Sequence, residues 1–459
     1  MSEYGETLRV SGVEVPRTPL SEAELDRLGL PRTFRRIEDA AARQRFVFDP
    51  ALKHRSHAYR TSDPEFADRQ ARAAWRRARR TAMDLVLAAI AGSPWRDHLV
   101  LRGSVLLAEW FGAAAREPKD LDFVVVPRDW RIEEDRTGEL LRDIARSAER
   151  TAATAAAEAG PDSPGDPDSP GDPDSPAAEP ARPAVRFDAR DAVSEDIWTY
   201  DRVPGRRLVL PWTCQGTPGG IVQLDVVFNE LLPVEPVTTT VAGVRLLGAT
   251  PELSLAWKLV WLAQDMHPQG KDLYDAVLLA EHCTLDYATL GAVFIAADPY
   301  YAGTPVTPDV TADMSPDDEW RHFVAEYPHL AGDPDEWLRR LRWALEPTFR
   351  PLIDDPRGAR RQWSAQWLDA CRAAYRDGGL PALLASLADQ KAPAAVAAAA
   401  VRDLVGAADL GAADGRAAAA VDHVLGHPAW ASRAQEFSAH NPGFRDRLIE
   451  RIAEVDLGA

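Results

Sequence analysis

The stretch Asp120-Leu121-Asp122-Phe123-Val124-Val125-Val126 carries the most information about the fold of this chain. Its apolar, β-branched residues predict a strand over about 121–126. Side chains alternate across a strand, so Asp120 and Asp122 project from one face and the apolar residues between them and after them project from the other. Two acids at the entrance of an apolar strand repel each other and are costly to desolvate. Either they are solvated, or they share a divalent cation such as Mg²⁺, which one or two carboxylates plus substrate phosphates commonly hold.

A Gly103-Ser104 pair precedes these acids. The sequence predicts a short strand over 98–101, then a tight turn at this pair, then a helix to about Phe111. Glycine lets the backbone approach a phosphate closely, and the start of a helix offers unpaired N–H groups and a positive dipole. Ser104 adds a hydroxyl. On its own such a pair is usually only a turn. Its position shortly before the two acids favours a phosphate-binding site.

A third acid, Asp225, lies within the hydrophobic segment 221–228. One face of this predicted strand is apolar throughout, and Asp225 lies on the opposite face between Gln223 and Val227. An acid in so hydrophobic a strand either belongs to a half-exposed sheet face or has a partner, which a neighbouring metal site can supply.

Charged residues also interrupt two predicted helices further along the chain. Lys258 shares the apolar face of a helix over 250–264 with Leu255 and Leu262, so its ammonium either extends to solvent or binds an anion. A second helix begins near Lys271, and Asp272 and Asp275 share one of its faces. Acids at a helix start also complement the helix dipole, so this pair alone does not identify a site.

The segment 151–183 separates two parts of the predicted sheet. PDSPGD at 161–166 is repeated at 167–172 and begins again at 173–176. Proline, glycine, serine and aspartate dominate, and apolar periodicity is absent, so the segment is predicted to be a disordered insert. It carries seven acids and one base within 151–182, a third of the net charge of −18. The rest of the chain is therefore less acidic than the total indicates.

The order of predicted elements gives the fold class. A helix over 63–91, capped by Asp63 with Pro64 in its first turn, precedes the strands above, and a helix from about 133 leads into the insert. Strands are predicted at 184–188, 197–200, 206–212 and 221–228, and helices dominate from about 315, with five tryptophans as core anchors: Trp320, Trp337, Trp343, Trp363 and Trp367. This order predicts an α+β fold, in which helices flank a mixed sheet and an α-helical C-terminal domain follows.

The predicted division has four parts. Residues 1–62 form an N-terminal arm, 63–248 a catalytic core that contains the insert, 249–375 a helical domain, and 376–459 an Ala-rich helical tail module.

The polar N-terminus is unlike a secretory signal, and no apolar run approaches the length that a membrane span requires. Three widely spaced cysteines exclude a disulfide framework and favour the cytoplasm. The acidic average charge means that nucleic acid can bind only at a local basic surface.

These motifs together resemble those of the polymerase-beta nucleotidyltransferase superfamily, and in particular the AbiEii/AbiGii toxin family. The resemblance covers about 95–285 and rests on Gly103-Ser104, Asp120-Leu121-Asp122-Phe123, Lys258 and Lys271-Asp272-Leu273-Tyr274-Asp275. Lys271 stands where the family usually has arginine, so the bidentate fork is missing there.

The resemblance implies a polymerase-beta-like core and an Mg²⁺-dependent transfer of NMP from an NTP. Asp120, Asp122 and Asp225 are the implied metal ligands, with Asp225 alternatively a base. Gly103, Ser104, Lys258 and Lys271 are expected to bind the nucleotide, and Asp272 or Asp275 to orient a lysine or the acceptor. The implied acceptor is RNA, such as a tRNA 3′ end, and the implied role is that of the toxin in a toxin–antitoxin or phage-defence system, with a cognate antitoxin as partner.

Other interpretations remain open at this stage. The acceptor can be a small molecule or a protein hydroxyl, or the chain can be a nucleotide-binding interaction protein with a degenerate site. Arginines recur every three or four residues along the predicted helix 63–91, which indicates either a phosphate-binding stripe or a solvated face. The stripe consists of Arg69, Arg72, Arg76, Arg79 and Arg80, with Arg77 beside it.

Overall fold

The computed structural model describes residues 12–16, 18, 20–37, 39, 42–52, 54–55, 57–158, 183–200, 203–264, 268–311, 317–330, 332–411, 415–441 and 443–458. The chain forms two compact units. The first contains the residues up to Glu230 together with Pro236–Ala249, and the second contains Leu231–Glu235 and the residues from Thr250 onward. The finer division into four parts stays a prediction.

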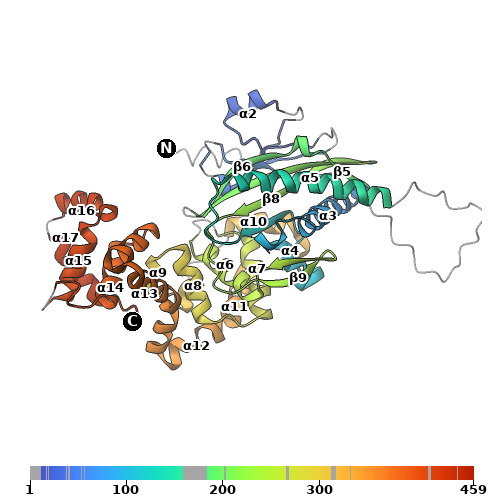
Figure 1. Ribbon diagram of the computed structural model, residues 1–459. Helices are drawn as coiled ribbons and strands as arrows, with labels where there is room; N and C mark the ends of the chain where they lie inside the picture. The colour runs from blue at the N-terminus through green and yellow to red at the C-terminus, as the bar shows by residue number, and fades with distance from the viewer. Residues whose placement is uncertain are drawn as a thin grey trace, which may run out of the picture. The chain divides into compact units, whose positions relative to one another are not determined.

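Within the described residues of the first unit, eight strands form one sheet (Figure 1). The strands are β3 (Leu99–Arg102), β4 (Asp120–Val125), β5 (Val185–Phe187), β6 (Val193–Tyr200), β7 (Val203–Cys214), β8 (Thr217–Val227), β9 (Val237–Val241) and β10 (Val244–Gly248). Their order is β5-β7-β8-β4-β3-β10-β9, and β6 also pairs with β7. The sheet is mixed, because β4 runs parallel to β8 and β10 parallel to β3 while the other pairings are antiparallel. The two strands that carry the predicted acids, β4 and β8, are therefore neighbours.

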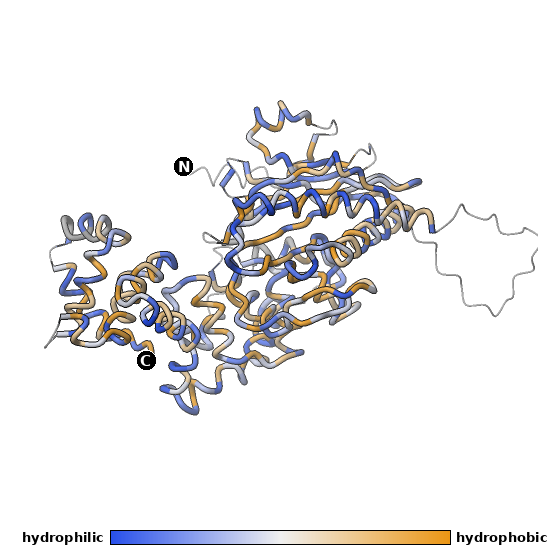
Figure 2. Tube along the Cα trace, in the orientation of Figure 1, coloured by the Kyte–Doolittle hydropathy of each residue, from blue (hydrophilic) through white to orange (hydrophobic). Residues whose placement is uncertain are grey.

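One face of this sheet is apolar and is covered by helices. Leu121 and Phe123 of β4 and Leu224 of β8 are fully buried on it. Helices α3 (Arg69–Ala91) and α5 (Asp135–Glu158) lie side by side (Figure 1), and Trp75 of α3 packs on Trp212 of β7 with ring centroids 6.1 Å apart. In Figure 2, hydrophobic and hydrophilic residues alternate along both helices, as expected when one side of a helix faces a core. The charged side chains of Asp122 and Asp225 project from the opposite face of the sheet.

Short elements complete the first unit. They are α2 (Glu22–Leu28), β1 (Phe46–Phe48), η1 (Pro50–Leu52), β2 (Tyr59–Thr61), η2 (Arg96–His98), α4 (Ser104–Phe111), η3 (Gly112–Ala114) and η4 (Ala189–Asp191). β1 and β2 form a separate two-stranded sheet, and a small hydrophobic cluster that includes Val15, Leu25 and Phe34 packs against Tyr59. The N-terminal segment, residues 12–62, therefore has a core of its own.

Three predictions about the first unit need correction. Helix α3 begins at Arg69 and is capped by Asp68, not by Asp63, because the Asp68 carboxylate accepts the backbone N–H groups of Gln70 and Ala71. The predicted insert is shorter at its start, since residues 151–158 continue α5; residues 159–182 lie outside the described residues. The β9–β10 hairpin was not predicted. Its turn places Ala242 and Gly243 at positive φ, and alanine gives no sequence signal for that conformation.

The second unit is helical in its described residues. Its α-helices are α6 (Pro251–Gln264), α7 (Gly270–His282), α8 (Tyr287–Ala297), α9 (Tyr300–Gly303), α10 (Asp317–Glu326), α11 (Pro334–Ala344), α12 (Glu346–Asp354), α13 (Pro356–Asp389), α14 (Ala394–Leu404), α15 (Arg416–Gly426), α16 (Pro428–His440) and α17 (Phe444–Glu454). Two 3-10 turns, η5 (Pro308–Thr311) and η6 (Pro328–Leu330), connect some of them. The α+β fold class with a helical C-terminal region is confirmed, and no helix in the described part of the chain is long and apolar enough to cross a membrane.

Most of the predicted tryptophan anchors are buried, but one is not. Trp320, Trp363 and Trp367 are buried, and Trp337 is partly buried against Tyr274 with ring centroids 4.8 Å apart. Trp343 is 77% exposed, so its assignment to the core was wrong. It lies on α11, whose core-facing side is supplied by Leu338 and Leu341 instead.

The cap of α3 provides a test of the corrected helix start. Asp68→Ala should lower the free energy of unfolding by about 1 kcal/mol, because two backbone N–H groups lose their acceptor. Asp68→Asn retains an acceptor oxygen and should cost much less. Urea unfolding of both variants measures the difference, and equal stability of the two would contradict the assigned cap.

Candidate active site

The Gly103-Ser104 turn lies directly against the two predicted metal ligands. Gly103 has φ +80°, and a Cβ at this position would lie only 2.6 Å from Oδ2 of Asp122. Ser104 begins α4, is 2% exposed, and its hydroxyl donates to Oδ1 of Asp120 over 3.5 Å. Glycine is therefore required at 103 both for its backbone conformation and for the close approach of the Asp122 carboxylate. The two motifs that the sequence places apart form one site.

Strand register aligns five charged residues in one row across the sheet. Paired residues project to the same face, and successive pairings join β3, β4, β8, β7 and β6. The row consists of Arg102, Asp122, Asp225, Arg207 and Glu195. Asp225 is therefore the direct cross-strand neighbour of Asp122, and Gln223 that of Asp120. The structure thus brings together the three acids that the sequence predicts for the metal site.

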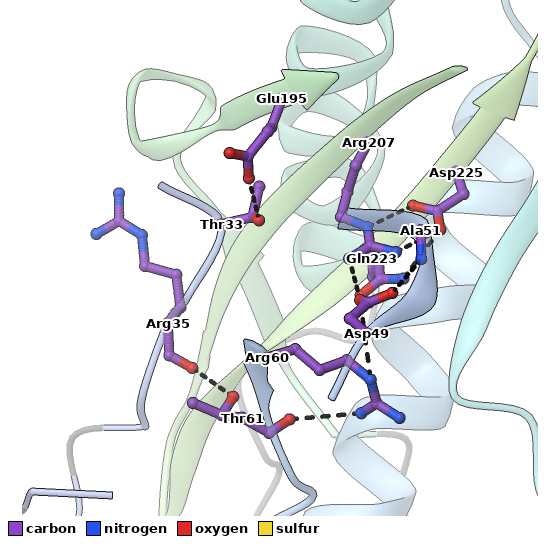
Figure 3. A network of polar contacts seen from close by, with 10 residues as sticks. All are labelled: Thr33, Arg35, Asp49, Ala51, Arg60, Thr61, Glu195, Arg207, Gln223 and Asp225. Atoms are coloured by element: carbon purple, nitrogen blue, oxygen red, sulfur yellow. Dashed lines mark hydrogen bonds and ion pairs between the residues drawn. The ribbon is translucent and has the colours of Figure 1, made fainter. Parts of the chain in front are cut away.

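The carboxylate of Asp225 is bound by an arginine that sequence reasoning missed. Arg207 donates from Nε to Oδ1 and from Nη2 to Oδ2 of Asp225, both over 2.8 Å, and Gln223 donates to Oδ2 over 3.1 Å. The third nitrogen of Arg207, Nη1, pairs with Oδ2 of Asp49 at 2.5 Å (Figure 3). Arg207 and Asp225 are 2% and 8% exposed. The pairing of Arg207 with Asp225 depends on the register of the β7–β8 hairpin. The sequence predicts these two strands but not their register.

Burial and the shared arginine act differently on the two acids of this network. Burial raises the pKa of Asp225 above its ordinary value, although Arg207 opposes the shift. Burial also disfavours the charged form of Asp49, but Arg207 and Arg60 outweigh it and hold the pKa of Asp49 below its ordinary value. Asp49 is thus the more firmly ionised partner of Arg207.

The donor set at this face suits a cation held by two carboxylates. Asp120 and Asp122 are both partly buried and project together beside the Gly103-Ser104 turn. This fits Mg²⁺, which uses one or two carboxylates and completes its shell with water and phosphate oxygens. Among the residues that the structure describes, no group of three or more His, Cys, Asp or Glu side chains is arranged to hold a metal ion. The assignment of Asp225 to the metal stays a prediction.

A second ion-pair network borders Asp120, and it changes the interpretation of the arginine stripe. Arg79 of α3 is buried between Asp63 and Glu117 at 2.9 and 3.0 Å, so its assignment to an exposed stripe was wrong. Lys119 pairs with Asp63 over 3.1 Å, and burial lowers the pKa of Lys119 to about 8.

The remaining arginines of α3 differ from Arg79. All are exposed, although Arg72 donates to a carbonyl, Arg76 pairs with Glu117 and Arg80 approaches Asp84. The exposed set is Arg69, Arg72, Arg76, Arg77 and Arg80. An exposed basic strip on α3 is compatible with phosphate binding and equally with a solvated face.

The second unit contains the other predicted group of residues. Lys258 on α6 is 4% exposed, and its ammonium lies 2.6 Å from Oδ1 of Asp272 and 2.9 Å from Oδ2 of Asp275, both on α7. Asp275 is fully buried. The start of α7 is held by packing of Trp320 against Gly270 and by the tilted ring contact between Tyr274 and Trp337. Lys271 is exposed, and its nucleotide-binding role stays a prediction.

Comparison with known proteins identifies the family of this chain. The model of the family described as "Nucleotidyl transferase AbiEii toxin, Type IV TA system" matches residues 85–347, more than half of the chain. Among solved structures, MenT4, a nucleotidyltransferase toxin from Mycobacterium tuberculosis H37Rv, is similar with 14% sequence identity and a TM-score of 0.36, over 67% of this chain and 92% of that chain. No curated protein matches the chain.

The family match spans Gly103, Ser104 and all six predicted catalytic residues, and it confirms the resemblance inferred from the motifs. The chain therefore belongs to the AbiEii family of nucleotidyltransferase toxins of type IV toxin–antitoxin systems.

Proposed function

We propose that this nucleotidyltransferase uses Mg²⁺ to transfer an NMP from an NTP to the 3′ end of an RNA, with tRNA as the preferred acceptor. The 3′-hydroxyl oxygen forms a bond to the α-phosphorus, and the bond from that phosphorus to the β-phosphate breaks, so that pyrophosphate leaves. The observation that carries the proposal is the close approach of Gly103 to Asp122 together with the Ser104–Asp120 contact. That geometry places a helix start with unpaired N–H groups beside two carboxylates, which is what binding of a metal–triphosphate complex requires.

In this proposal Asp120 and Asp122 hold the Mg²⁺, which when bound neutralises charge on the triphosphate. Gly103 and Ser104 hold phosphate oxygens through the backbone N–H groups at the start of α4 and through the Ser104 hydroxyl. Nucleotidyl transfer depends mainly on positioning and on charge stabilisation, so rigid placement of these groups is the contribution of the protein. The buried positions of the β3–α4 turn support such rigidity.

Of the two roles that the sequence leaves open for Asp225, metal ligand or base, we assign it that of the base. A carboxylate oxygen can accept two hydrogen bonds. Within the described part of the chain, Oδ2 receives Arg207 and Gln223, whereas Oδ1 receives Arg207 alone. Oδ1 therefore retains capacity for one further donor. We assign that capacity to the attacking hydroxyl of the acceptor, which Asp225 would orient and deprotonate.

Lys258 is proposed to contact the triphosphate, with Asp272 and Asp275 fixing its ammonium. Support comes from the family match and from the two short ion pairs, which hold a buried cation in one place. Lys271 is proposed to bind phosphate as a point charge at the exposed start of α7.

Family membership and charge support proposals for the acceptor, the partner and the compartment. The exposed arginines of α3 supply a local basic surface on an acidic protein, which an RNA backbone needs. A type IV toxin implies a cognate antitoxin, and a role in phage defence is the corresponding biological proposal. The proposed substrates, NTP and tRNA, favour the cytoplasm as the compartment of the reaction.

Removal of the metal ligands tests the reaction. Asp120→Asn and Asp122→Asn should each lower transfer from NTP by about 100-fold or more, because a charged group that acts on the transition state is lost. The assay incubates each of the four α-labelled NTPs with Mg²⁺ and total RNA. Transfer that survives in both variants would contradict the metal site.

The same assay separates the possible acceptors. Label in RNA that is removed by ribonuclease supports the proposal, whereas label confined to protein or to small molecules would overturn the RNA acceptor and leave nucleotidyl transfer standing. The matched control is Asp97→Asn in η2, an exposed acid that lies outside the carboxylate site and off the basic strip of α3, which should leave transfer unchanged.

Substitution of Gly103 tests the turn. Gly103→Ala should lower transfer by at least about 10-fold, because the new methyl group displaces the Asp122 carboxylate and strains a positive φ. Gly112→Ala, at another positive-φ glycine with open space around it, gives the control for backbone strain alone. Equal transfer by the two variants, measured at equal stability, would contradict the proposed importance of the close approach.

Lys258 requires a test that separates folding from catalysis. Lys258→Met leaves Asp272 and Asp275 buried without their cation and should lower the free energy of unfolding by about 3–5 kcal/mol. Lys258→Arg keeps the charge, so it should remain folded and raise the KM for NTP. Urea unfolding and steady-state kinetics give the two quantities, and an unchanged KM in Lys258→Arg would argue against a triphosphate contact.

A further inference from the structure

The N-terminal segment, residues 12–62, is joined to the catalytic sheet by two buried polar contacts. In the first, Asp49 pairs with Arg207 of β7. In the second, Glu195 of β6 accepts the Thr33 hydroxyl over 2.7 Å and pairs with Arg55 at 2.5 Å. Both acids are buried, and Figure 3 shows the Asp49–Arg207 pair and the Thr33–Glu195 hydrogen bond. This segment lies outside the family match, which begins at residue 85.

The first contact leads through Arg207 directly to Asp225 of the candidate active site. Arg207 uses three of its nitrogens, two for Asp225 and one for Asp49. The guanidinium is planar and rigid, so fixing the carboxylate on one edge fixes the position of the carboxylate on the other. Figure 3 shows Arg207 between the two acids.

Asp49 is itself held firmly from the N-terminal side. Its Oδ1 accepts the backbone N–H of Ala51 over 3.1 Å at the start of η1, and Arg60 of β2 approaches its Oδ2 at 4.0 Å. Leu52, which ends η1, is fully buried in a cluster with Ala58 and with Ile197 of β6. The position of Asp49 is therefore set by the fold of the N-terminal segment and by its packing on the sheet.

Asp225 needs such support because of its neighbour. It faces Asp122 in the β4–β8 register, and two carboxylates side by side in a sheet repel each other. Without a fixed cation behind it, the Asp225 side chain would turn away from Asp122. Arg207 supplies that cation. Because Asp49 also binds Arg207, the guanidinium cannot follow a rotation of the Asp225 side chain.

We propose that Asp49 is a positioning residue for nucleotidyl transfer, which acts through Arg207 to hold the Asp225 carboxylate beside Asp122. This inference rests on the proposed function. The N-terminal segment, which the family match does not include, would then contribute to the active site by positioning Asp225.

The test is a double-mutant cycle in the full-length protein with a matched control. Asp49→Asn should lower kcat by about 10-fold and change the KM for NTP by less than about twofold, because orientation and not nucleotide binding is lost. In an Asp225→Asn background, Asp49→Asn should have no further effect on kcat. Thr33→Val removes the hydroxyl donor of the other contact of the same segment but keeps the charge of Glu195, so it should leave kcat within about twofold of wild type at a comparable loss of Tm.

Two results would overturn the inference and leave the proposed function intact. One is an equal loss of kcat in Asp49→Asn and Thr33→Val. The other is a double variant in which the separate effects of Asp49→Asn and Asp225→Asn on kcat multiply. Either would make Asp49 a structural contact only. If Asp49→Asn fails to fold, Arg207→Lys makes the same comparison, because lysine keeps the charge but lacks the fork. Absence of transfer by the wild-type protein would instead refute the proposed function, and the inference with it.

Discussion

Repulsion between Asp122 and Asp225 is the constraint on which this structure depends. The parallel pairing of β4 and β8 sets these acids side by side in a largely buried sheet. Two unit charges about 5 Å apart repel by roughly 3 kcal/mol at an effective dielectric constant of 20. Arg207 donates to Asp225 and offsets this repulsion. The Asp122 carboxylate lies against Gly103, where a bound cation would neutralise its charge. Function and stability thus share one electrostatic arrangement.

The same principle explains the second unit. Lys258 is buried with two acids on α7, so it balances charge that the fold would otherwise have to exclude from its interior. A lysine held in this way has a fixed ammonium, which suits recognition of an anion, but its removal also leaves two buried acids without their cation and is expected to destabilise the fold. Loss of activity on its removal is therefore weak evidence of a catalytic role unless stability is measured as well.

Local motifs made much of the fold and site predictable. The alternation around Asp120 and Asp122, the Gly103-Ser104 turn, and the helix of Lys258 all depend on residues close in sequence, and the strands and helices there agree with the prediction. Arg207 and Asp49 could not be found in this way, because their pairing depends on hairpin register and on contacts across 158 residues. Arg79 and Trp343 were misassigned because periodicity does not reveal what another segment covers. The cap of α3 was wrongly assigned to Asp63, because an acid followed by proline is typical of a helix start.

The most direct measurement of the central claim is a crystal structure with Mg²⁺ and a non-hydrolysable NTP analogue. The account predicts a metal bound by Asp120 and Asp122, phosphate oxygens at the backbone N–H groups of Gly103 and Ser104, and an Asp225 carboxylate still held by Arg207. A triphosphate bound elsewhere, with the Asp120–Asp122 face free of metal, would contradict it.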